Sequence, residues 1–296
     1  MNYRKLGKSE LYISEIGFGC MSLDDDQAAN SKIIHGALDG GINFFDTADL
    51  YQKGYNESMV GKALKEKRKN IILATKVGNR WREDGSGWDW CANKKYIQEA
   101  IEKSLTRLQT DYIDLYQLHG GTIEDPIEEV TEAFENLQQQ GKIRYYGISS
   151  IRPNVIREYV SRSNIVSVLM QYSLLDRRPE ETCLGLLLQS NIGVLARGVL
   201  AKGLLIDKPA ERYMEFNVEV VKEILLNIQS IIGDTISKTG IALQYVLKHP
   251  AITSAVAGIR TTEHLTGILS ASKEILNDRQ RKFLEQLPSH KYLEHR

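Results

Sequence analysis

Cysteine and proline are scarce in this chain of 296 residues, and neither sign of charge is in excess. Cys20, Cys91 and Cys183 form a small, odd and scattered set, which argues against a disulfide framework and for a reducing cytoplasm. The chain has no Cys-x-x-Cys pair and its six histidines show no paired ligand spacing, so we expect no metal site. Its 38 basic residues balance 38 acidic ones, so the chain has no net positive charge that would attract nucleic acid or an anionic membrane as a partner.

Long apolar runs and internal linkers are also missing. No segment approaches the roughly 20 apolar residues of a membrane helix, and residues 1–5 lead into no apolar stretch, so we expect neither a membrane span nor a signal peptide. No proline-rich, low-complexity or charge-block segment divides the chain. With 42% hydrophobic and 26% charged residues, the chain can bury a sizeable core. We therefore expect one cytoplasmic domain over residues 1–296, as a monomer or a small homo-oligomer.

Apolar, β-rich runs alternate with helical periodicities along nearly the whole chain. A hairpin is expected first, over residues 3–6 and 11–14 with a turn at 8–10. Eight strands are then expected, at residues 16–19, 42–45, 71–75, 112–118, 143–148, 165–170, 192–196 and 254–257. Helices are expected at residues 31–40, 57–67, 94–108, 127–140, 152–162, 179–189, 217–232, 235–248, 263–271 and 278–287. Asp125-Pro126 is typical of a helix N-cap followed by the first turn.

The expected strands are apolar throughout rather than alternating, which is typical of parallel strands covered on both faces. Eight strands, each followed by a helix, in about 300 residues predict an α/β fold, a (β/α)8 TIM barrel with an N-terminal β-hairpin. A doubly wound sheet is the alternative, and it requires a Gly-x-Gly-x-x-Gly turn after its first strand. The turn here, Gly17-Phe18-Gly19-Cys20-Met21-Ser22, lacks the third glycine, which favours the barrel.

Three of the early strand candidates end in an ionisable residue: Asp46, Lys76 and His119. Tyr51 follows the first of these residues by five positions. Because one rim of a parallel barrel collects the C-terminal ends of all strands, we expect the four side chains to meet there. Each residue alone has a simpler structural explanation. Asp46 could be a turn residue, Tyr51 a packing residue, Lys76 a lysine at the barrel rim and His119 a residue that begins a loop. All four of these explanations would have to hold together along consecutive strand ends, and this requirement favours a catalytic site instead.

This set of groups suits the reduction of a carbonyl compound. A bound dihydronicotinamide must supply the hydride, since side chains cannot, and a positioned acid must protonate the developing alkoxide. A free phenol has a pKa of about 10, and a nearby ammonium lowers the pKa of such a group by favouring the phenolate. A carboxylate can hold that ammonium charged and in place, and an imidazole can polarise and orient the carbonyl.

Several motifs together resemble those of the aldo-keto reductases, most closely the bacterial NADPH-dependent members. They occur in order along almost the whole chain, at residues 45–51 (FDTADLY), 74–76 (ATK), 116–119 (YQLH), 147–150 (GISS), 171–173 (QYS) and 258–261 (GIRT). The resemblance implies NADPH-dependent reduction of aldehydes or ketones. It also implies that Asp46, Tyr51, Lys76 and His119 are catalytic, with Tyr51 as the general acid.

The same resemblance implies a nicotinamide site on the rim. Ser149 and Ser150 lie where the family has a Ser-Asn pair for the carboxamide, so Ser150 is a departure. Gln171 matches the glutamine of the family that binds this carboxamide. Arg197 is expected to take the place of the aromatic ring that stacks on the nicotinamide, since a guanidinium is also planar. Cys20 and Met21 are expected to line the cofactor cleft.

The segments expected at the pyrophosphate and adenosine ends depart further from the family pattern. The backbone from Gly198 to Lys202, with Val199 and Leu200, is expected to approach the pyrophosphate, where glycine gives close access. Gly258 and Arg260 resemble the segment that pairs with the 2′-phosphate of NADPH, a task suited to a guanidinium. His264 and Gly267-Ile268 stand where the family has Gln and Glu-Asn at the adenine end. NADPH is therefore the expected cofactor, with NADH as an open alternative.

All three tryptophans, Trp81, Trp88 and Trp90, lie in one loop after Lys76. The resemblance implies that they wall a pocket for a small-molecule carbonyl substrate, although they could equally pin a long loop to the barrel. Two other functions remain open. The chain could be a nucleotide-occupied redox sensor or interaction subunit with little turnover, or an NAD-linked dehydrogenase that oxidises alcohols.

Overall fold

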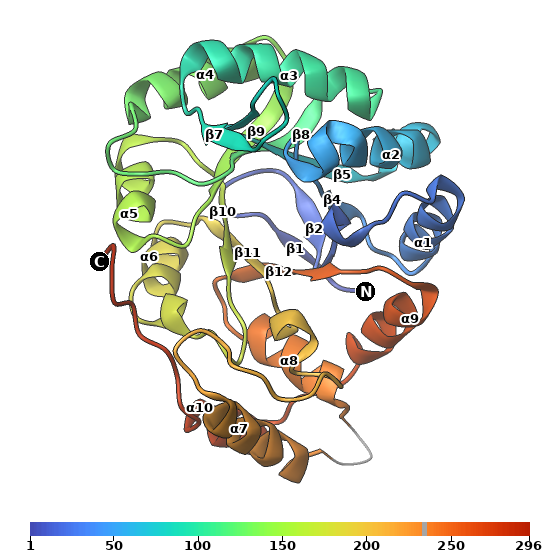
Figure 1. Cartoon of the computed structure of the whole chain (residues 1–296), viewed down its shortest axis with the longest axis vertical. Helices are drawn as coiled ribbons and strands as arrows, with labels where there is room; N and C mark the ends of the chain where they lie inside the picture. The colour runs from blue at the N-terminus through green and yellow to red at the C-terminus, as the bar shows by residue number, and fades with distance from the viewer. Residues whose placement is uncertain (233–235) are drawn as a thin grey trace.

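Eight parallel strands form a closed barrel surrounded by helices (Figure 1). The structure, a computed structural model, describes residues 1–232 and 236–296. In order around the barrel, the strands are β3 (Ile16–Gly19), β4 (Phe44–Asp46), β5 (Ile72–Val77), β8 (Ile113–Leu118), β9 (Ile143–Ser149), β10 (Ser167–Gln171), β11 (Gly193–Arg197) and β12 (Ile252–Gly258). The predicted TIM barrel is therefore confirmed, and each predicted strand overlaps an observed one.

The barrel strands are buried on both faces, which explains their continuous apolar sequences. One face fills the barrel interior with side chains such as Phe44, Leu115 and Leu195. The other face, including Phe45 and Tyr116, packs under the surrounding helices. Burial of these two apolar layers is the main force that holds the strand ends in a fixed arrangement.

The predicted N-terminal hairpin is present and contributes to the interior of the barrel. Its strands β1 (Tyr3–Lys5) and β2 (Tyr12–Ser14) are antiparallel, and Leu6 and Ile13 belong to the same buried cluster as the interior strand residues. Gly7 has a φ of +51°, and a Cβ there would lie 2.5 Å from the Val166 carbonyl oxygen. Only glycine allows such an approach, which brings the hairpin against the strand end opposite the predicted rim.

The helices follow the strands as predicted: α1 (Gln27–Asp39), α2 (Tyr55–Leu64), α3 (Lys94–Leu108), α4 (Ile127–Gln139), α5 (Pro153–Arg162), α6 (Cys183–Gln189), α7 (Val218–Ser230), α8 (Lys238–Leu247), α9 (Thr262–Ala271) and α10 (Asp278–Glu285). The helix expected over 179–189 is divided, because a short 3-10 turn, Arg178–Glu180, precedes α6. Thr235, the expected start of the helix at 235–248, lies outside the described residues; α8 begins at Lys238.

Asp125 does not cap α4, which corrects the sequence-based expectation. The N-cap position is Pro126, without a side-chain capping bond. The ψ of Pro126 is 76°, outside the helical range, so Pro126 does not form the first turn and the helix starts one residue later than the Asp125 signal implies. The Asp125 carboxylate instead accepts hydrogen bonds from the Trp90 indole N–H (2.8 Å) and the Thr122 backbone N–H (2.7 Å).

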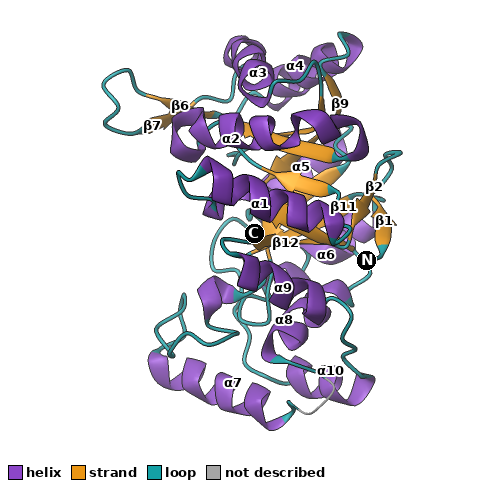
Figure 2. Cartoon of the chain, turned by 90° about the vertical axis from the view of Figure 1, so that its right-hand side faces the viewer, coloured by secondary structure: helices purple, strands orange, loops and turns teal. Residues whose placement is uncertain are grey.

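A second antiparallel hairpin, not predicted from the sequence, follows the strand that carries Lys76. Its strands are β6 (Asn79–Trp81) and β7 (Trp88–Trp90), and Trp81 pairs with Trp88 in the register. Figure 2 shows this hairpin extending away from the barrel strands. The three tryptophans are thus held on an ordered hairpin with defined orientations rather than on an irregular loop.

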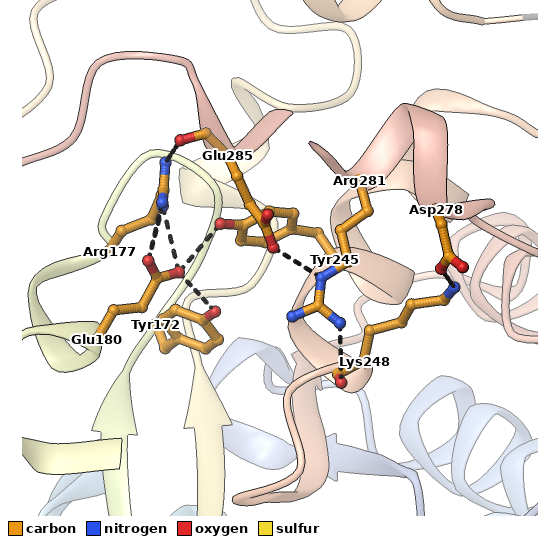
Figure 3. A network of polar contacts seen from close by, with 8 residues as sticks. All are labelled: Tyr172, Arg177, Glu180, Tyr245, Lys248, Asp278, Arg281 and Glu285. Carbon is orange, nitrogen blue, oxygen red and sulfur yellow. Dashed lines mark hydrogen bonds and ion pairs between the residues drawn. The ribbon is translucent and has the colours of Figure 1, made fainter. Parts of the chain in front are cut away.

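The C-terminal helix α10 is tied to the barrel by a polar network (Figure 3). The Glu180 carboxylate accepts hydrogen bonds from the hydroxyls of Tyr172 (2.9 Å) and Tyr245 (3.0 Å) and pairs with Arg177. The Arg177 guanidinium also donates to the Glu285 carbonyl oxygen at 3.0 Å. Three more residues of Figure 3 join α10 to the end of α8: Arg281, Lys248 and Asp278. The network couples the end of β10 to the C-terminal part of the chain.

Candidate active site

Lys76 lies at the centre of the predicted catalytic group. It is fully buried near the end of β5, next to β4, which ends at Asp46. Its ammonium donates to Asp46 Oδ2 at 2.6 Å, to the Thr47 carbonyl oxygen at 2.7 Å and to Tyr51 Oη at 3.4 Å. The carboxylate, the ammonium and the phenol are therefore in direct contact at the rim, as the strand-end argument predicts.

Opposing effects act on the pKa values of this buried pair. Burial alone lowers the pKa of Lys76, but the charge of Asp46 and the contact with Tyr51 outweigh it, so the pKa of Lys76 is raised. Lys76 therefore keeps its proton at neutral pH. Burial raises the pKa of Asp46, while Lys76 and then Gln117 oppose that rise by stabilising the carboxylate. The ion pair is maintained by the mutual contact, because either charge alone would be unfavourable at this depth.

His119 completes the group from the end of β8. Its ring meets the Tyr51 ring edge-on, with 5.8 Å between centroids and 83° between planes. Burial, followed by the charges of Lys76 and Arg197, lowers the pKa of His119 to about 3. The imidazole is therefore neutral at physiological pH. Among the described residues, its Nδ1 has no hydrogen-bond partner.

A left-handed turn directs Tyr51 toward the rim. The three residues after it, Gln52, Lys53 and Gly54, have φ values of 50°, 55° and 88°. Two of them are not glycines, so the turn carries conformational strain that its surroundings must balance. The Trp81 indole N–H donates to the Leu50 carbonyl oxygen at 3.2 Å, which binds hairpin β6–β7 to this turn.

Sequence reasoning missed one residue of the cluster, Gln117. Its amide donates to Asp46 Oδ1 at 3.2 Å, and its side chain is fully buried. It lies on β8, two positions before His119, which directly follows that strand. Because alternate residues of a strand share a face, this spacing was the signal that could have identified it.

The four predicted nicotinamide-binding residues lie at or next to the ends of β9, β10 and β11. Ser149 and Ser150 are buried at the end of β9. Gln171 pairs with Arg197 in the strand register, and the exposed Arg197 guanidinium donates to Gln171 Oε1 at 3.3 Å. The Gln171 amide group donates to Asp176 Oδ2 (2.9 Å), which fixes the orientation of its oxygen. This rim segment therefore offers hydroxyl, amide and guanidinium groups at the ends of three neighbouring strands.

The segment after β11 forms a tight turn with exposed backbone. Gly198 and Lys202 are exposed and have φ values of 67° and 58°. Val199 is buried and Leu200 half-buried, so these two residues contribute backbone rather than side chains to the surface. The Ala201 amide already donates to the Gly198 carbonyl oxygen at 2.9 Å. The exposed glycine and lysine suit an anionic group in this position.

The last predicted cofactor segment leads from β12 into α9. Gly258, Arg260 and His264 are all exposed. Thr261 caps α9, and its hydroxyl accepts from the His264 backbone N–H at 3.2 Å. A guanidinium next to a helix N-terminus provides two favourable interactions for a phosphate, one from its charge and one from the helix dipole.

Cys20 and Met21 differ in their access to the rim. The Cys20 side chain is fully buried in the apolar layer between barrel and helices, and burial raises its pKa far above that of a free thiol. Met21 is 66% exposed. Of the two predicted lining residues, Met21 is the one whose side chain is accessible.

The three tryptophans also differ. Trp90 is half-buried, and its ring packs on Gly78 and Gly120, where a Cβ would approach it to 2.8 and 3.1 Å. It therefore pins hairpin β6–β7 to the rim, together with its bond to Asp125. Trp81 is half-buried and covers the turn after Tyr51, and Trp88 is 47% exposed.

Two further observations concern the described residues as a set. Within residues 1–232 and 236–296, no helix combines the length and the apolar character needed to cross a membrane. The same ranges contain no group of three or more His, Cys, Asp or Glu side chains that could hold a metal ion.

Comparison with known proteins identifies the family. The Aldo/keto reductase family matches residues 15–288. The uncharacterized oxidoreductase YqkF of Bacillus subtilis is 51% identical over 96% of both chains. The holo form of aldo-keto reductase AKR11C1 from Bacillus halodurans has a TM-score of 0.95 and 48% identity, and covers 100% of this chain and 99% of its own. The aldo-keto reductase yakc [NADP(+)] of Schizosaccharomyces pombe is 29% identical over 93% of this chain and 88% of its own. The chain therefore belongs to the aldo/keto reductase family, whose members act on small carbonyl compounds with nicotinamide cofactors, and is an NAD(P)H-dependent oxidoreductase.

Proposed function

We propose that the protein reduces aldehydes or ketones to alcohols with NADPH, and that Tyr51 is the proton donor. The contact between Tyr51 Oη and the Lys76 ammonium, which is itself held by Asp46 Oδ2 at 2.6 Å, is the main observation in support. A phenol next to a fixed cation can release its proton to a developing alkoxide, because the cation stabilises the phenolate that remains.

Each neighbour of Tyr51 then has a distinct task. The nicotinamide, when bound, supplies the hydride. Asp46 keeps Lys76 charged and in place, and Lys76 stabilises the phenolate. His119 is neutral, so it can hydrogen-bond to the substrate carbonyl without adding charge and hold the carbonyl oxygen near the phenol. The buried surroundings strengthen these interactions, because little water screens them.

The cofactor is proposed to extend over the ends of β9 to β12. Ser149, Ser150 and the oriented oxygen of Gln171 would bind the carboxamide, and Arg197 would lie against the ring. Gly198 to Lys202 would approach the pyrophosphate, with Met21 at the opposite side; the buried Cys20 side chain would not reach the cofactor. A cation at Arg197 disfavours the positively charged oxidised ring relative to the neutral reduced one, which suits reduction.

NADPH is proposed over NADH because of the segment Gly258–His264. Arg260 is exposed beside the N-terminus of α9, where it can pair with a 2′-phosphate. The relative yakc carries NADP(+) in its name. For the substrate, Trp81 and Trp88 are proposed to contact a small carbonyl compound, and Trp90 to support the pocket wall.

Steady-state oxidation of NADPH with methylglyoxal and nitrobenzaldehyde tests this function. We expect turnover by the wild type and a loss of 10²- to 10⁴-fold, on the order given by removal of a general acid, in Tyr51→Phe. Tyr55→Phe is the matched control, because Tyr55 is 48% exposed on α2 and should leave the rate unchanged. Turnover that persists in Tyr51→Phe contradicts the assignment of the acid. Stoichiometric NADPH binding without any turnover by the wild type would instead indicate a sensor.

A further inference from the structure

Both oxygens of the Asp46 carboxylate are engaged, but by different kinds of donor. Oδ2 accepts from the Lys76 ammonium, and Oδ1 accepts from the Gln117 amide at 3.2 Å. Among the described residues, Oδ1 has no other hydrogen-bond donor. Two donors on opposite oxygens determine the plane of a carboxylate, whereas one donor leaves it free to rotate.

The position of Gln117 follows from the strand register. Lys76 of β5 pairs with Gln117 of β8, and Asp46 of β4 pairs with Ala74 of β5. Gln117 shares the inward face of β8 with Leu115, so its side chain crosses β5 inside the barrel to reach β4. The contact therefore joins two strands that are not neighbours.

A packing role explains Gln117 poorly. Its own oxygen, Oε1, is buried and has no partner among the described residues. An unsatisfied buried oxygen destabilises the fold, and an apolar side chain of equal length would avoid that cost. The amide group is consistent with a need for its N–H donors at Asp46.

We propose that Gln117 is a positioning residue of the reaction: its amide fixes the Asp46 carboxylate so that Oδ2 faces Lys76, and it keeps that carboxylate ionised. This inference rests on the proposed function of Asp46, Lys76 and Tyr51. Without the amide, Oδ1 would be buried with no donor, and Asp46 would bind a proton more readily as the pH falls. Lys76 would then lose its counter-charge and would no longer be held at the phenol.

The groups facing Asp46 allow a pH profile to be interpreted. They are Lys76 from β5, the thiol of Cys20 after β3, and Arg197 from β11, with His119 and Tyr51 beyond Lys76. His119 is neutral at physiological pH, and the Cys20 thiol is protonated. A change at Gln117 should therefore act on the acidic limb of the profile through Asp46.

Two variants and one control test the inference. Gln117→Met keeps the length and removes the donors. Gln117→Glu is isosteric and can donate to Oδ1 only while it is protonated. Ser167→Ala is the control, because Ser167 is fully buried on β10 and its hydroxyl has no partner among the described residues. The readouts are kcat for NADPH oxidation between about pH 5 and 9, NADPH affinity by quenching of tryptophan fluorescence, and circular dichroism to establish folding.

We expect Gln117→Met to lower kcat about tenfold and to move its acidic limb upward by about one pH unit, with NADPH affinity unchanged. In Gln117→Glu, the activity should instead fall as the pH rises and the new carboxyl group ionises. Ser167→Ala should match the wild type. If Gln117→Met folds and keeps the wild-type dependence of kcat on pH, this inference alone is overturned. If Gln117→Met does not fold, the same result with Gln117→Glu overturns it. A wild type without NADPH oxidation overturns the proposed function and this inference with it.

Discussion

At the scale of single residues, the Lys76 ammonium determines the organisation of the site. An ammonium has three N–H donors, and all three are used, on Asp46, Thr47 and Tyr51. The side chain is completely buried, so the charge is stable only with its partners in place. The residue must therefore contribute to stability as well as to the chemistry proposed for Tyr51.

This pairing predicts a specific pattern of unfolding energies. Lys76→Met leaves the Asp46 carboxylate buried without its counter-charge and should lower the free energy of unfolding by about 3–5 kcal/mol. The double variant Lys76→Met/Asp46→Leu removes both charges and should be less destabilised than Lys76→Met alone. Urea unfolding of the two single variants and the double variant measures this coupling. If the loss of unfolding free energy in the double variant equals the sum of the losses in the two single variants, the coupling is contradicted.

The sequence pattern could predict that Asp46, Lys76 and His119, three of the proposed catalytic residues, lie close together, because they occur at or next to the ends of β4, β5 and β8. Gln117 lies inside a strand in an apolar context. Its spacing from His119 suggests that it faces the same side, but its contact with Asp46 follows from the register across β5. Asp125 was misread for a related reason: its local pattern is that of an N-cap, but its partner, Trp90, is distant in sequence. Contacts of this kind depend on how elements meet in space.

At the scale of elements, close helix contacts hold α2, the helix that begins just after the Tyr51 turn. Gly61 of α2 lies against the backbone of Leu108 in α3, and a Cβ there would come within 2.5 Å of it. Backbone cannot move aside as a side chain can, so the two helices must separate to accept a larger residue. The turn that holds Tyr51 would be displaced with α2.

Gly61→Ala should therefore lower the free energy of unfolding by about 1–3 kcal/mol, the usual range for overpacking. The matched control is Gly185→Ala in α6, where no atom lies within 4 Å of the added Cβ. Alanine favours a helix over glycine by about 1 kcal/mol, so this variant should be slightly stabilised. Urea unfolding of both variants tests this prediction. If the two substitutions change the free energy of unfolding equally and in the same direction, the close contact at Gly61 is contradicted.

The elements differ in how far the sequence reveals them. The barrel strands are continuous apolar runs, and the helices between them have clear ends, so both could be predicted. Hairpin β6–β7 has strands of three residues that carry polar side chains, and its stability comes from Trp90 on Gly78 and Gly120. The left-handed residues Gln52 and Lys53 likewise follow from tertiary contacts, because neither residue type favours that conformation.

At the scale of the whole molecule, the fold brings distant segments together to form one rim and to fasten its supports. The network around Glu180 connects β10, α8 and α10, which are far apart in sequence. Gln171, proposed to bind the cofactor, directly precedes Tyr172 of this network. The chain order predicts the barrel, but the partners of Glu180 could not be chosen from the sequence, because many acidic and basic residues compete for that role.

The burial of His119 links the folded site to the pH dependence of stability. The folded-state pKa of His119, about 3, is lower than the ordinary value of 6.5. Above that ordinary value the imidazole is neutral in both the folded and the unfolded protein, so His119 does not lower the free energy of unfolding. As the pH falls below it, the unfolded chain binds a proton that the folded protein does not, so the folded state loses stability.

From about pH 7.5 to pH 5, this residue should lower the free energy of unfolding by about 2 kcal/mol. His119→Gln removes the titrating group and should not show that part of the loss. We therefore expect the difference in unfolding free energy between variant and wild type to shift by about 2 kcal/mol in favour of the variant at the lower pH. Urea unfolding of both proteins at the two pH values measures the shift, and other histidines cancel in the comparison. If that difference is the same at both pH values, the imidazole becomes charged in the folded protein. Its role as a neutral partner of the carbonyl would then have to be abandoned.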